Sequence, residues 1–340
     1  MSDINALSAY DYELPQELIA SSPVMPKEHA RLLVYERASG KILHLTFGDL
    51  ASVIPKKTAI IFNDTKVIKA RLFGKKQSGG AIELLLNQPL EDGKFSCYIR
   101  GKVSVGQRLE FQNCIEAEIL ELFNDGLRVV KFYKNDALLG ANTLFCELEK
   151  IGHVPLPPYI KRADKKQDES WYQSIFASKA GAVAAPTASL HFSDEMMSEI
   201  SANFKTAYIT LHVGAGTFKG VECEDIRQHV MHGEFYSISD EAVDLINSDT
   251  ALLGVGTTST RCVENFARNG VKSGICELFL NPNNRPIRQN YLLTNFHLPR
   301  STLIMLVASF IGLEKTMQIY ETAVKERYRF YSYGDGMLII

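Results

Sequence analysis

Residues 181–218 read GAVAAPTASLHFSDEMMSEISANFKTAYITLHVGAGTF, and this stretch decides the predicted fold of the chain. A loop of small residues leads into a helix predicted at 193–202, with Ser193 as its N-cap. A strand is predicted at 207–213, and glycines follow it directly. A polar loop, a helix and a strand that ends in glycine-rich backbone commonly build a small-molecule site. We therefore expect the rest of the chain to support this stretch and to supply its partner groups.

The same alternation of strands and helices continues to the end of the chain. Further strands are predicted at 58–62, 251–256 and 275–280, and further helices at 240–247, 260–269, 301–312 and 314–329. Alternating strands and helices are typical of an α/β fold, in which a mostly parallel sheet is covered by helices on both faces. We therefore predict this α/β class for the body of the protein.

A region with a different sequence pattern lies between the first predicted strand and the rest of the body. From residue 66 to about 133, short apolar or alternating segments are divided by Gly, Asn or Asp. Short strands with regular turns predict a small all-β barrel. The predicted organisation is an α/β catalytic body at 1–65 and 151–340, with a β-barrel domain inserted at 66–150. The segment 153–170 has three prolines and many charges, and we expect a connector or a lid there.

Composition limits the class of protein. The chain has 340 residues, 46% of them hydrophobic and 22% charged, and a net charge of −2. This balance excludes a uniformly basic nucleic-acid binder but allows a local basic patch. The first residues carry no basic segment followed by an apolar one, and the longest apolar run is too short to span a bilayer. Six scattered cysteines without a CxxC pair predict free thiols in a reducing cytosol. We expect a cytoplasmic protein with no membrane partner.

Two glycine-containing loops are candidates for binding a small molecule. VGAGT at 213–217 lacks the full G-x-G-x-x-G spacing, so a tight turn and a nucleotide loop both remain open. GTTSTR at 256–261 places hydroxyl and N–H groups at a helix start, which suits an anion, with Arg261 as a bidentate donor. Plain helix capping by Thr260 is the alternative. Neither loop has the lysine of a P-loop, which argues against nucleotide triphosphate hydrolysis.

Histidines and lysines give two further expectations. His191 and His212 could serve as acid, base or hydrogen-bond donor, or could be structural. His229 and His232 have a spacing that suits a metal, but no convincing further ligand accompanies them, so we predict no metal. Basic residues gather at 56–76 and 161–166, which predicts a local surface for phosphates.

Motifs along nearly the whole chain resemble one known family. They occur in the order FNDTKVIKARLFG, GHVPLPPYIKR, GAVAAPTASLHF, ITLHVGAGTF, GTTSTR, LLTNFHLPRSTL and YRFYSYGDGMLI. Together they resemble the S-adenosylmethionine:tRNA ribosyltransferase-isomerases of queuosine biosynthesis. The chain departs from the family pattern at Ser189, where a glycine is usual, and in the segment 281–290.

The resemblance implies a transferase. Family members transfer and isomerise the ribosyl moiety of S-adenosylmethionine onto 7-aminomethyl-7-deazaguanine at the wobble position of tRNA. Epoxyqueuosine forms, and adenine and methionine leave. The implied partners are S-adenosylmethionine and tRNA with a GUN anticodon, with no cofactor, and we expect a monomer or weak homodimer. Two alternatives stay open, an S-adenosylmethionine-dependent RNA methyltransferase and a non-catalytic RNA-binding protein.

This reaction needs a base for a C5′ proton, a donor for the departing adenine, an anion site and aromatic faces. The catalytic candidates are His191, His212, Asp64 and Asp335. The substrate-binding candidates are Thr187, Phe192, Gly214, Gly216, Thr217, Phe218, Thr257, Thr258, Ser259, Arg261, Asn295, Tyr331 and Tyr333. The tRNA-binding candidates are Lys66, Arg71, Arg300 and Arg329.

Overall fold

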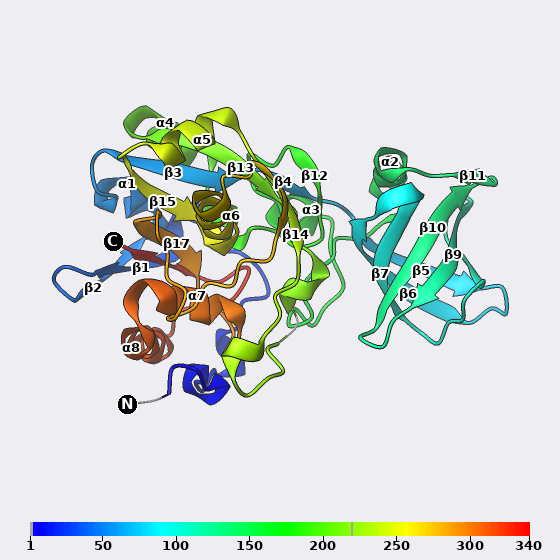
Figure 1. Ribbon diagram of the computed structural model, residues 1–340, viewed down its shortest axis with the longest axis horizontal. Helices are drawn as coiled ribbons and strands as arrows, with labels where there is room; N and C mark the ends of the chain where they lie inside the picture. The colour runs from blue at the N-terminus through cyan, green and yellow to red at the C-terminus, as the bar shows by residue number, and fades with distance from the viewer. Residues whose placement is uncertain (1–2, 219) are drawn as a thin grey trace.

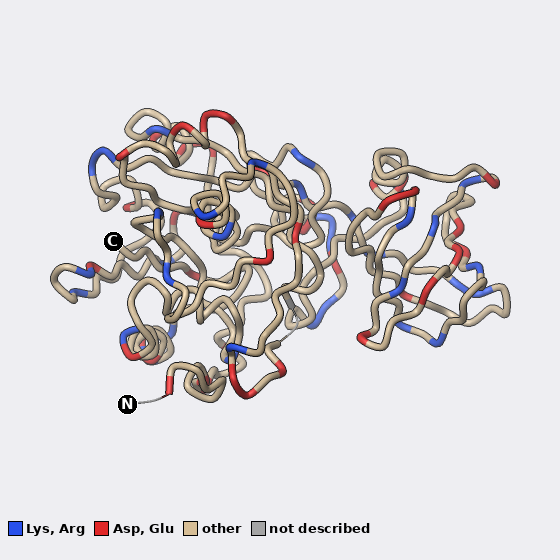
Figure 2. Tube along the Cα trace, in the orientation of Figure 1, with Lys and Arg blue, Asp and Glu red and all other residues tan. Residues whose placement is uncertain are grey.

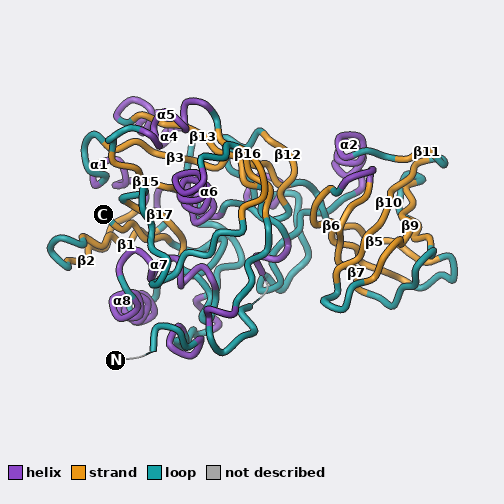
Figure 3. The backbone as a smooth tube through the Cα atoms, viewed as in Figure 1, coloured by secondary structure: helices purple, strands orange, loops and turns teal. Residues whose placement is uncertain are grey.

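The computed structural model describes residues 3–218 and 220–340, apart from the side chain of Phe218. The molecule consists of an α/β body and a β-barrel that lies beside it (Figure 1). The first described residues and the C-terminal end of the chain lie on the body. Loop structure is concentrated on the side of the body that faces the barrel (Figure 3).

A sheet of nine strands forms the centre of the body. In spatial order its strands are β16 (Ser273–Cys276), β14 (Glu234–Ile238), β13 (Lys205–Leu211), β3 (Thr58–Asn63), β15 (Ala251–Val255), β17 (Tyr291–Asn295), β18 (Gly336–Ile339), β1 (Arg31–Glu36) and β2 (Lys41–Thr46). Of the eight neighbouring pairs, four are parallel and four antiparallel. The sheet is therefore mixed, which corrects the prediction of a mostly parallel sheet.

Alternate residues of the strands enter two separate cores, as the period of two in a strand requires. In β1, Leu32 and Val34 face one core, and Leu33 and Tyr35 face the other. The helices α1 (Leu50–Val53) and α4 (Asp194–Asn203) cover the first face. The helices α5 (Asp240–Asn247), α6 (Gly256–Asn269), α7 (Thr302–Ile311) and α8 (Leu313–Lys325) cover the second. The predicted covering of both faces by helices is confirmed.

The helix ends follow the residues that the sequence offers. Ser193 caps α4, with its hydroxyl 3.3 Å from the Met196 nitrogen, and Ser239 caps α5 in the same way. Gly270 ends α6 with a φ of 69°, a conformation that glycine adopts without strain. Short 3₁₀ helices connect the larger elements: η1 (Leu7–Tyr10), η2 (Gln16–Leu18), η3 (Lys27–His29), η4 (Phe47–Asp49), η5 (Glu91–Gly93), η6 (Thr187–His191), η7 (Ala215–Phe218) and η8 (Ile226–Gln228).

Among the described residues, no single helix is both long and apolar enough to cross a membrane. By length and composition alone, α7 and α8 pass as a pair, with a bend of 115° between them.

Six antiparallel strands close into the barrel. Around the ring they are β5 (Arg71–Lys76), β6 (Ala81–Pro89), β7 (Lys94–Arg100), β10 (Leu127–Lys134), β9 (Ile115–Leu122) and β8 (Arg108–Glu110), and β11 (Ala137–Leu138) pairs with β10. Buried side chains such as Leu84, Phe95 and Phe132 fill the interior, and α2 (Ala141–Ile151) adds Leu144 and Leu148 to this core. The predicted barrel is confirmed, and its strands lie within the predicted insertion, whose bounds stay a prediction.

The chain leaves the body for the barrel and returns to it at one place. The short strands β4 (Thr65–Val67) and β12 (Lys179–Ala182) pair in parallel beside the main sheet. A few residues later, the backbone of Arg71 exchanges two hydrogen bonds with that of His153, at 3.3 and 2.9 Å. The outgoing and returning segments are thus held side by side.

Candidate active site

A cavity of about 120 Å³ opens where β13, β15 and β17 end. These three strands run in the same direction as β3, so their carboxyl ends lie along one edge of the sheet, the usual place for a ligand in α/β folds. The polar wall comes from strand ends and from the start of α6, and the other wall is aromatic and apolar. The lining includes Thr187, Thr257, Thr258, Thr294, Asn295, Tyr159, Tyr172, Phe296, Leu303 and Tyr331.

Two further hollows share walls with this cavity. A smaller one of about 40 Å³ also contacts Thr217, Thr257 and Thr258. A groove of about 590 Å³ lies outside it and shares Tyr159, Pro299 and Tyr331. The rings of Tyr159 and Tyr331 lie 4.5 Å apart between centroids, at the border between cavity and groove. Burial raises the pKa of Tyr159 to about 12, so its hydroxyl stays neutral. We call these spaces the inner cavity, the side cavity and the outer groove.

The first turn of α6 forms part of the inner cavity. Gly256 begins the helix with a φ of +86°, which favours glycine, and no side chain caps the helix start. Thr257 and Thr258 line both cavities, while the hydroxyl of Ser259 turns back to the Val255 carbonyl at 2.9 Å. An uncapped helix N-terminus favours an anionic group. Of the predicted residues, Thr257 and Thr258 are therefore placed to contact a ligand, and Ser259 is not.

Arg261 has structural partners. Its guanidinium donates to the carboxylate of Glu234 and to the carbonyls of Leu278 and Cys276, the last two at 3.0 Å. Glu234 in turn accepts from the Gly214 nitrogen at 3.0 Å. Arg261 therefore ties the loop after β13 to β14 and β16. Its edge lines the side cavity, but these contacts favour a structural role over the predicted capture of an anion.

His191 lies behind the inner cavity and is buried. Its ring stacks on Phe47, with centroids 3.9 Å apart, and its Nε2 is 3.2 Å from the Nδ2 of Asn295. Burial lowers its pKa to about 3, with a smaller contribution from the charges of Lys27 and Arg329. The imidazole is thus neutral at neutral pH, and Asn295 links it to the cavity wall.

His212 and Asp64 lie together at the ends of β13 and β3, outside the three hollows. The Nδ1 of His212 is 2.8 Å from the hydroxyl of Thr65, and its ring stacks on Phe235. Burial lowers the pKa of His212, and the nearby Asp64 opposes this shift. Asp64 accepts hydrogen bonds from Thr210 at 2.6 Å and from Ser178. The catalytic roles of this pair stay predictions.

The remaining predicted residues fall into different surroundings. Asp335 is buried and accepts from the backbone nitrogens of Arg31 and Arg329, at 3.0 and 2.7 Å; burial raises its pKa. Phe192 packs edge-on against Phe62 in the core. A side chain on Gly216 would meet the ring of His232 at 2.8 Å, so this glycine permits close packing of two loops. The side chain of Phe218 lies outside the described part of the chain.

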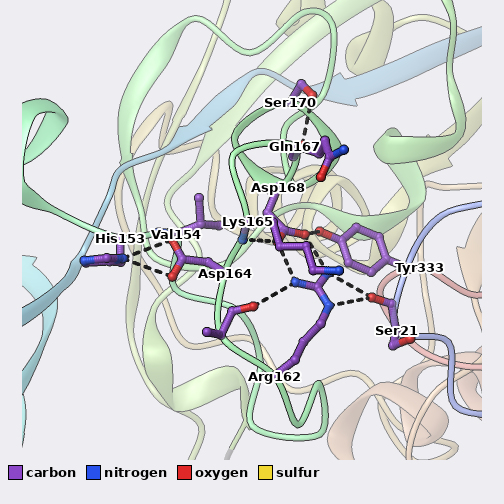
Figure 4. Close-up of polar contacts among 11 residues, drawn as sticks. Ser21, His153, Val154, Arg162, Asp164, Lys165, Gln167, Asp168, Ser170 and Tyr333 are labelled. Carbon is purple, nitrogen blue, oxygen red and sulfur yellow. Dashed lines mark hydrogen bonds and ion pairs between the residues drawn. The ribbon is translucent and has the colours of Figure 1, made fainter.

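A loop at 152–173 supplies the aromatic wall, and a buried ion pair anchors it (Figure 4). Arg162 donates to both carboxylate oxygens of Asp168, at 2.6 and 2.7 Å, and Asp168 is fully buried. The Lys165 nitrogen and the Tyr333 hydroxyl also donate to Asp168, at 2.7 and 3.0 Å. Tyr333 is therefore a support for this loop.

This loop also supplies site residues that the sequence analysis did not single out. Tyr159 and Tyr172 both line the inner cavity. Tyr159 lies in the proline-rich and charged segment 153–170, for which the sequence predicted only a connector or a lid, and Tyr172 lies just after that segment.

The predicted tRNA-binding residues differ in their surroundings. Lys66 is exposed, and Arg300 is half-exposed beside Asp11. Arg71 is partly buried, faces Glu83 at 3.2 Å and donates to the Leu156 carbonyl, and Arg329 donates to the Ser22 carbonyl. Figure 2 shows Lys and Arg along the side of the body that faces the barrel. Lys66 and Arg300 are thus better placed for phosphates than Arg71 and Arg329.

No group of three or more possible metal ligands occurs among residues 3–218 and 220–340. Glu234, which the sequence places near His232, is instead bound to Arg261.

The fold and cavity define an α/β protein that binds a small molecule at its strand ends and carries a barrel as an accessory domain. Comparison with known proteins gives the family. The sequence profile described as "Queuosine biosynthesis protein" matches residues 7–339, and the chain belongs to this family.

Proteins named S-adenosylmethionine:tRNA ribosyltransferase-isomerase are similar along their whole length. The one from Campylobacter concisus is 68% identical over 340 residues, which is all of both chains. The one from Sulfurimonas denitrificans is 55% identical over 98% of both chains. The crystal structure of S-adenosylmethionine tRNA ribosyltransferase from Thermotoga maritima is 32% identical, with a TM-score of 0.55, and the match covers 98% of this chain and 100% of that one.

Proposed function

We propose that the protein is an S-adenosylmethionine:tRNA ribosyltransferase-isomerase of queuosine biosynthesis. It transfers and isomerises the ribosyl moiety of S-adenosylmethionine onto 7-aminomethyl-7-deazaguanine at the wobble position of tRNA. Epoxyqueuosine forms in the RNA, and adenine and methionine are released. The observation that carries this proposal is similarity over the full chain to proteins of that name.

The geometry suggests how the two substrates enter. S-adenosylmethionine occupies the inner cavity, where aromatic walls suit its adenosine and its sulfonium. The carboxylate of its methionine lies at the uncapped start of α6. The wobble nucleotide enters through the outer groove, past Tyr159 and Tyr331, where aromatic rings allow a base to stack.

Proton transfer at C5′ requires a base. His191 is neutral and buried, and Asp335 is held by two backbone N–H groups, so neither is available to substrate. His212 is partly buried and lies in the field of Asp64, which makes this pair the better candidates. We therefore propose that His212 and Asp64 take part in proton transfer, which requires substrate to extend beyond the inner cavity.

Release of adenine tests the function and this pair. The purified chain is mixed with S-adenosylmethionine and tRNA that carries 7-aminomethyl-7-deazaguanine, and adenine and the mass of the RNA are measured. Adenine release and addition of the ribosyl-derived epoxycyclopentane ring of epoxyqueuosine are expected. Transfer of a methyl group would instead indicate a methyltransferase, and binding without any product an RNA-binding protein. His212→Ala and Asp64→Asn should abolish adenine release in folded protein, and near-normal turnover in either variant would remove that residue from catalysis.

Finer points belong to the same proposal. The tRNA substrates carry a GUN anticodon, the reaction uses no metal or added cofactor, and the chain acts as a monomer or weak homodimer. Turnover is therefore expected in buffer that contains EDTA, and sedimentation at micromolar concentration should show mostly monomer.

A further inference from the structure

Among the residues that line the inner cavity, the hydroxyl of Tyr172 and one amide oxygen are buried without a hydrogen-bond partner. The amide oxygen is the more informative of the two, because it can only accept a hydrogen bond. It is the side-chain oxygen Oδ1 of Asn295, a residue that is 1% exposed at the end of β17. Among the described residues, no donor reaches this oxygen. Buried polar atoms are nearly always paired, so an unpaired one in a cavity wall indicates a missing ligand.

The other atom of the same amide fixes its orientation. The Nδ2 of Asn295 donates to the Tyr331 carbonyl at 3.0 Å and lies 3.2 Å from the Nε2 of His191. A carbonyl oxygen only accepts hydrogen bonds, so the amide nitrogen must face it and the amide oxygen must face away. Tyr331 holds this carbonyl with a φ of +71°, a strained conformation for a non-glycine residue that is common at functional sites.

The surroundings of Oδ1 indicate the chemistry of the missing group. Tyr159, Phe296 and Tyr331 give the cavity aromatic faces, and Leu298 and Leu303 add apolar surface. Such walls suit a flat heterocycle, and an acceptor in the wall requires an N–H group at the edge of that heterocycle.

We propose that Asn295 determines specificity by accepting a hydrogen bond from an amino or ring N–H group on a purine-type base held in the inner cavity. The inference rests on the proposed function, which supplies two such bases, the adenine of S-adenosylmethionine and the 7-deazaguanine of the tRNA. His191 is then a positioning residue. It accepts from Nδ2 and so helps to fix the orientation of the amide.

The test compares natural substrates with analogues that lack one amino group. The first analogue is the sulfonium compound whose purine lacks the 6-amino group. The second is an anticodon stem-loop whose 7-deazapurine lacks the 2-amino group. Binding of each pair to the wild type is measured by calorimetry. At least a tenfold preference for one natural substrate is expected, because its analogue leaves Oδ1 unpaired.

Variants assign that preference to Asn295. Asn295→Ala should reduce the preference to about onefold, while Asn295→Asp, which keeps an acceptor oxygen, should retain part of it. His191→Phe keeps a flat ring on Phe47 but removes Nε2, so a smaller loss of preference is expected. Ser189→Ala is the matched control, because the hydroxyl of Ser189 is also buried without a partner but does not line the cavity. It should keep the wild-type preference.

The outcomes separate the two levels of the proposal. If Asn295→Ala loses the preference for S-adenosylmethionine over its analogue, the inference is supported and the hydrogen bond is assigned to adenine. If it loses the preference for the natural stem-loop over its analogue, the inference is supported and the bond is assigned to the RNA base. If Asn295→Ala folds and keeps both wild-type ratios, or if the wild type shows no preference in either pair, the inference is overturned. The proposed function fails separately, when wild-type protein releases no adenine from the natural substrates.

Discussion

Buried histidines make the stability of this protein depend on pH. Burial lowers the pKa of both His191 and His297 to about 3, whereas an unfolded histidine has a pKa of about 6.5. Between these values the unfolded chain binds protons that the folded chain does not. The contribution of the two neutral histidines to the free energy of unfolding is therefore complete above about pH 6.5, and it is lost as the pH falls toward 3. At pH 5, the loss is about 2 kcal/mol for each histidine.

Urea unfolding at pH 7 and pH 5 measures this effect. Carboxylates also lose stabilising contacts in acid, so the variant His191→Phe isolates one histidine while its ring still stacks on Phe47. The free energy of unfolding in this variant should fall by about 2 kcal/mol less than in the wild type between the two pH values. Equal losses in both proteins would contradict a neutral, buried His191.

At the same scale, the residue types of the site could be predicted from the sequence, but their partners could not. Thr257, Thr258 and Asn295 all line the cavity, and their roles toward a ligand stay predictions. Arg261 and Asp335 look equally functional in sequence, yet each binds a neighbouring segment. A buried charge needs a partner, and the sequence does not say whether a ligand or the fold provides it.

Among the elements, the loop at 152–173 depends most on one contact. Asp168→Asn would leave the guanidinium of Arg162 without its carboxylate in a largely buried position. Breaking such a pair costs about 3 to 5 kcal/mol, and part of this loss should appear as local opening of the loop. Hydrogen exchange at the Lys165 amide, together with denaturant unfolding, measures both effects.

A matched control is available on the surface. The pair between Lys272 and Asp240 is 2.7 Å long but mostly exposed, so Lys272→Gln should change the free energy of unfolding by no more than about 1 kcal/mol. Equal effects of the two substitutions would mean that the Arg162–Asp168 pair does not anchor the loop.

Strand and helix positions could be read from local patterns, while strand direction could not. Apolar runs and serine caps locate β3, β13, β15 and the helices α4 and α5. However, β18 pairs in parallel with β1 from the other end of the chain and antiparallel with β17. Direction depends on which distant segments meet, and periodicity carries no information about that.

Across the whole molecule, exposed cations on the barrel-facing side should make tRNA binding sensitive to salt. If four phosphates are contacted, raising the salt from 50 to 200 mM should weaken binding by about a hundredfold, because counterions are released from the RNA. Filter binding across this range measures the slope of log Kd against log salt.

Two lysines distinguish this surface from a general charge effect. Lys66→Ala should lower the slope by about one, since each phosphate contact contributes roughly that amount. Lys41, on the distant strand β2, is also exposed, and Lys41→Ala should leave the slope unchanged. A flat salt response in the wild type would remove the phosphate-binding surface from the proposal.

The backbone bridge between Arg71 and His153 has a consequence for the order of folding. Bringing two ends of a flexible chain together becomes entropically harder as the intervening segment lengthens. A barrel that folds first removes this obstacle, because its closed ladder leaves the two ends about 5 Å apart, as partners in an antiparallel pair are. For the folding of the body, the folded barrel then acts as a short connection between residues 71 and 153. In kinetic terms, a barrel that folds first offsets the increase in contact order that the insertion would otherwise impose on the body.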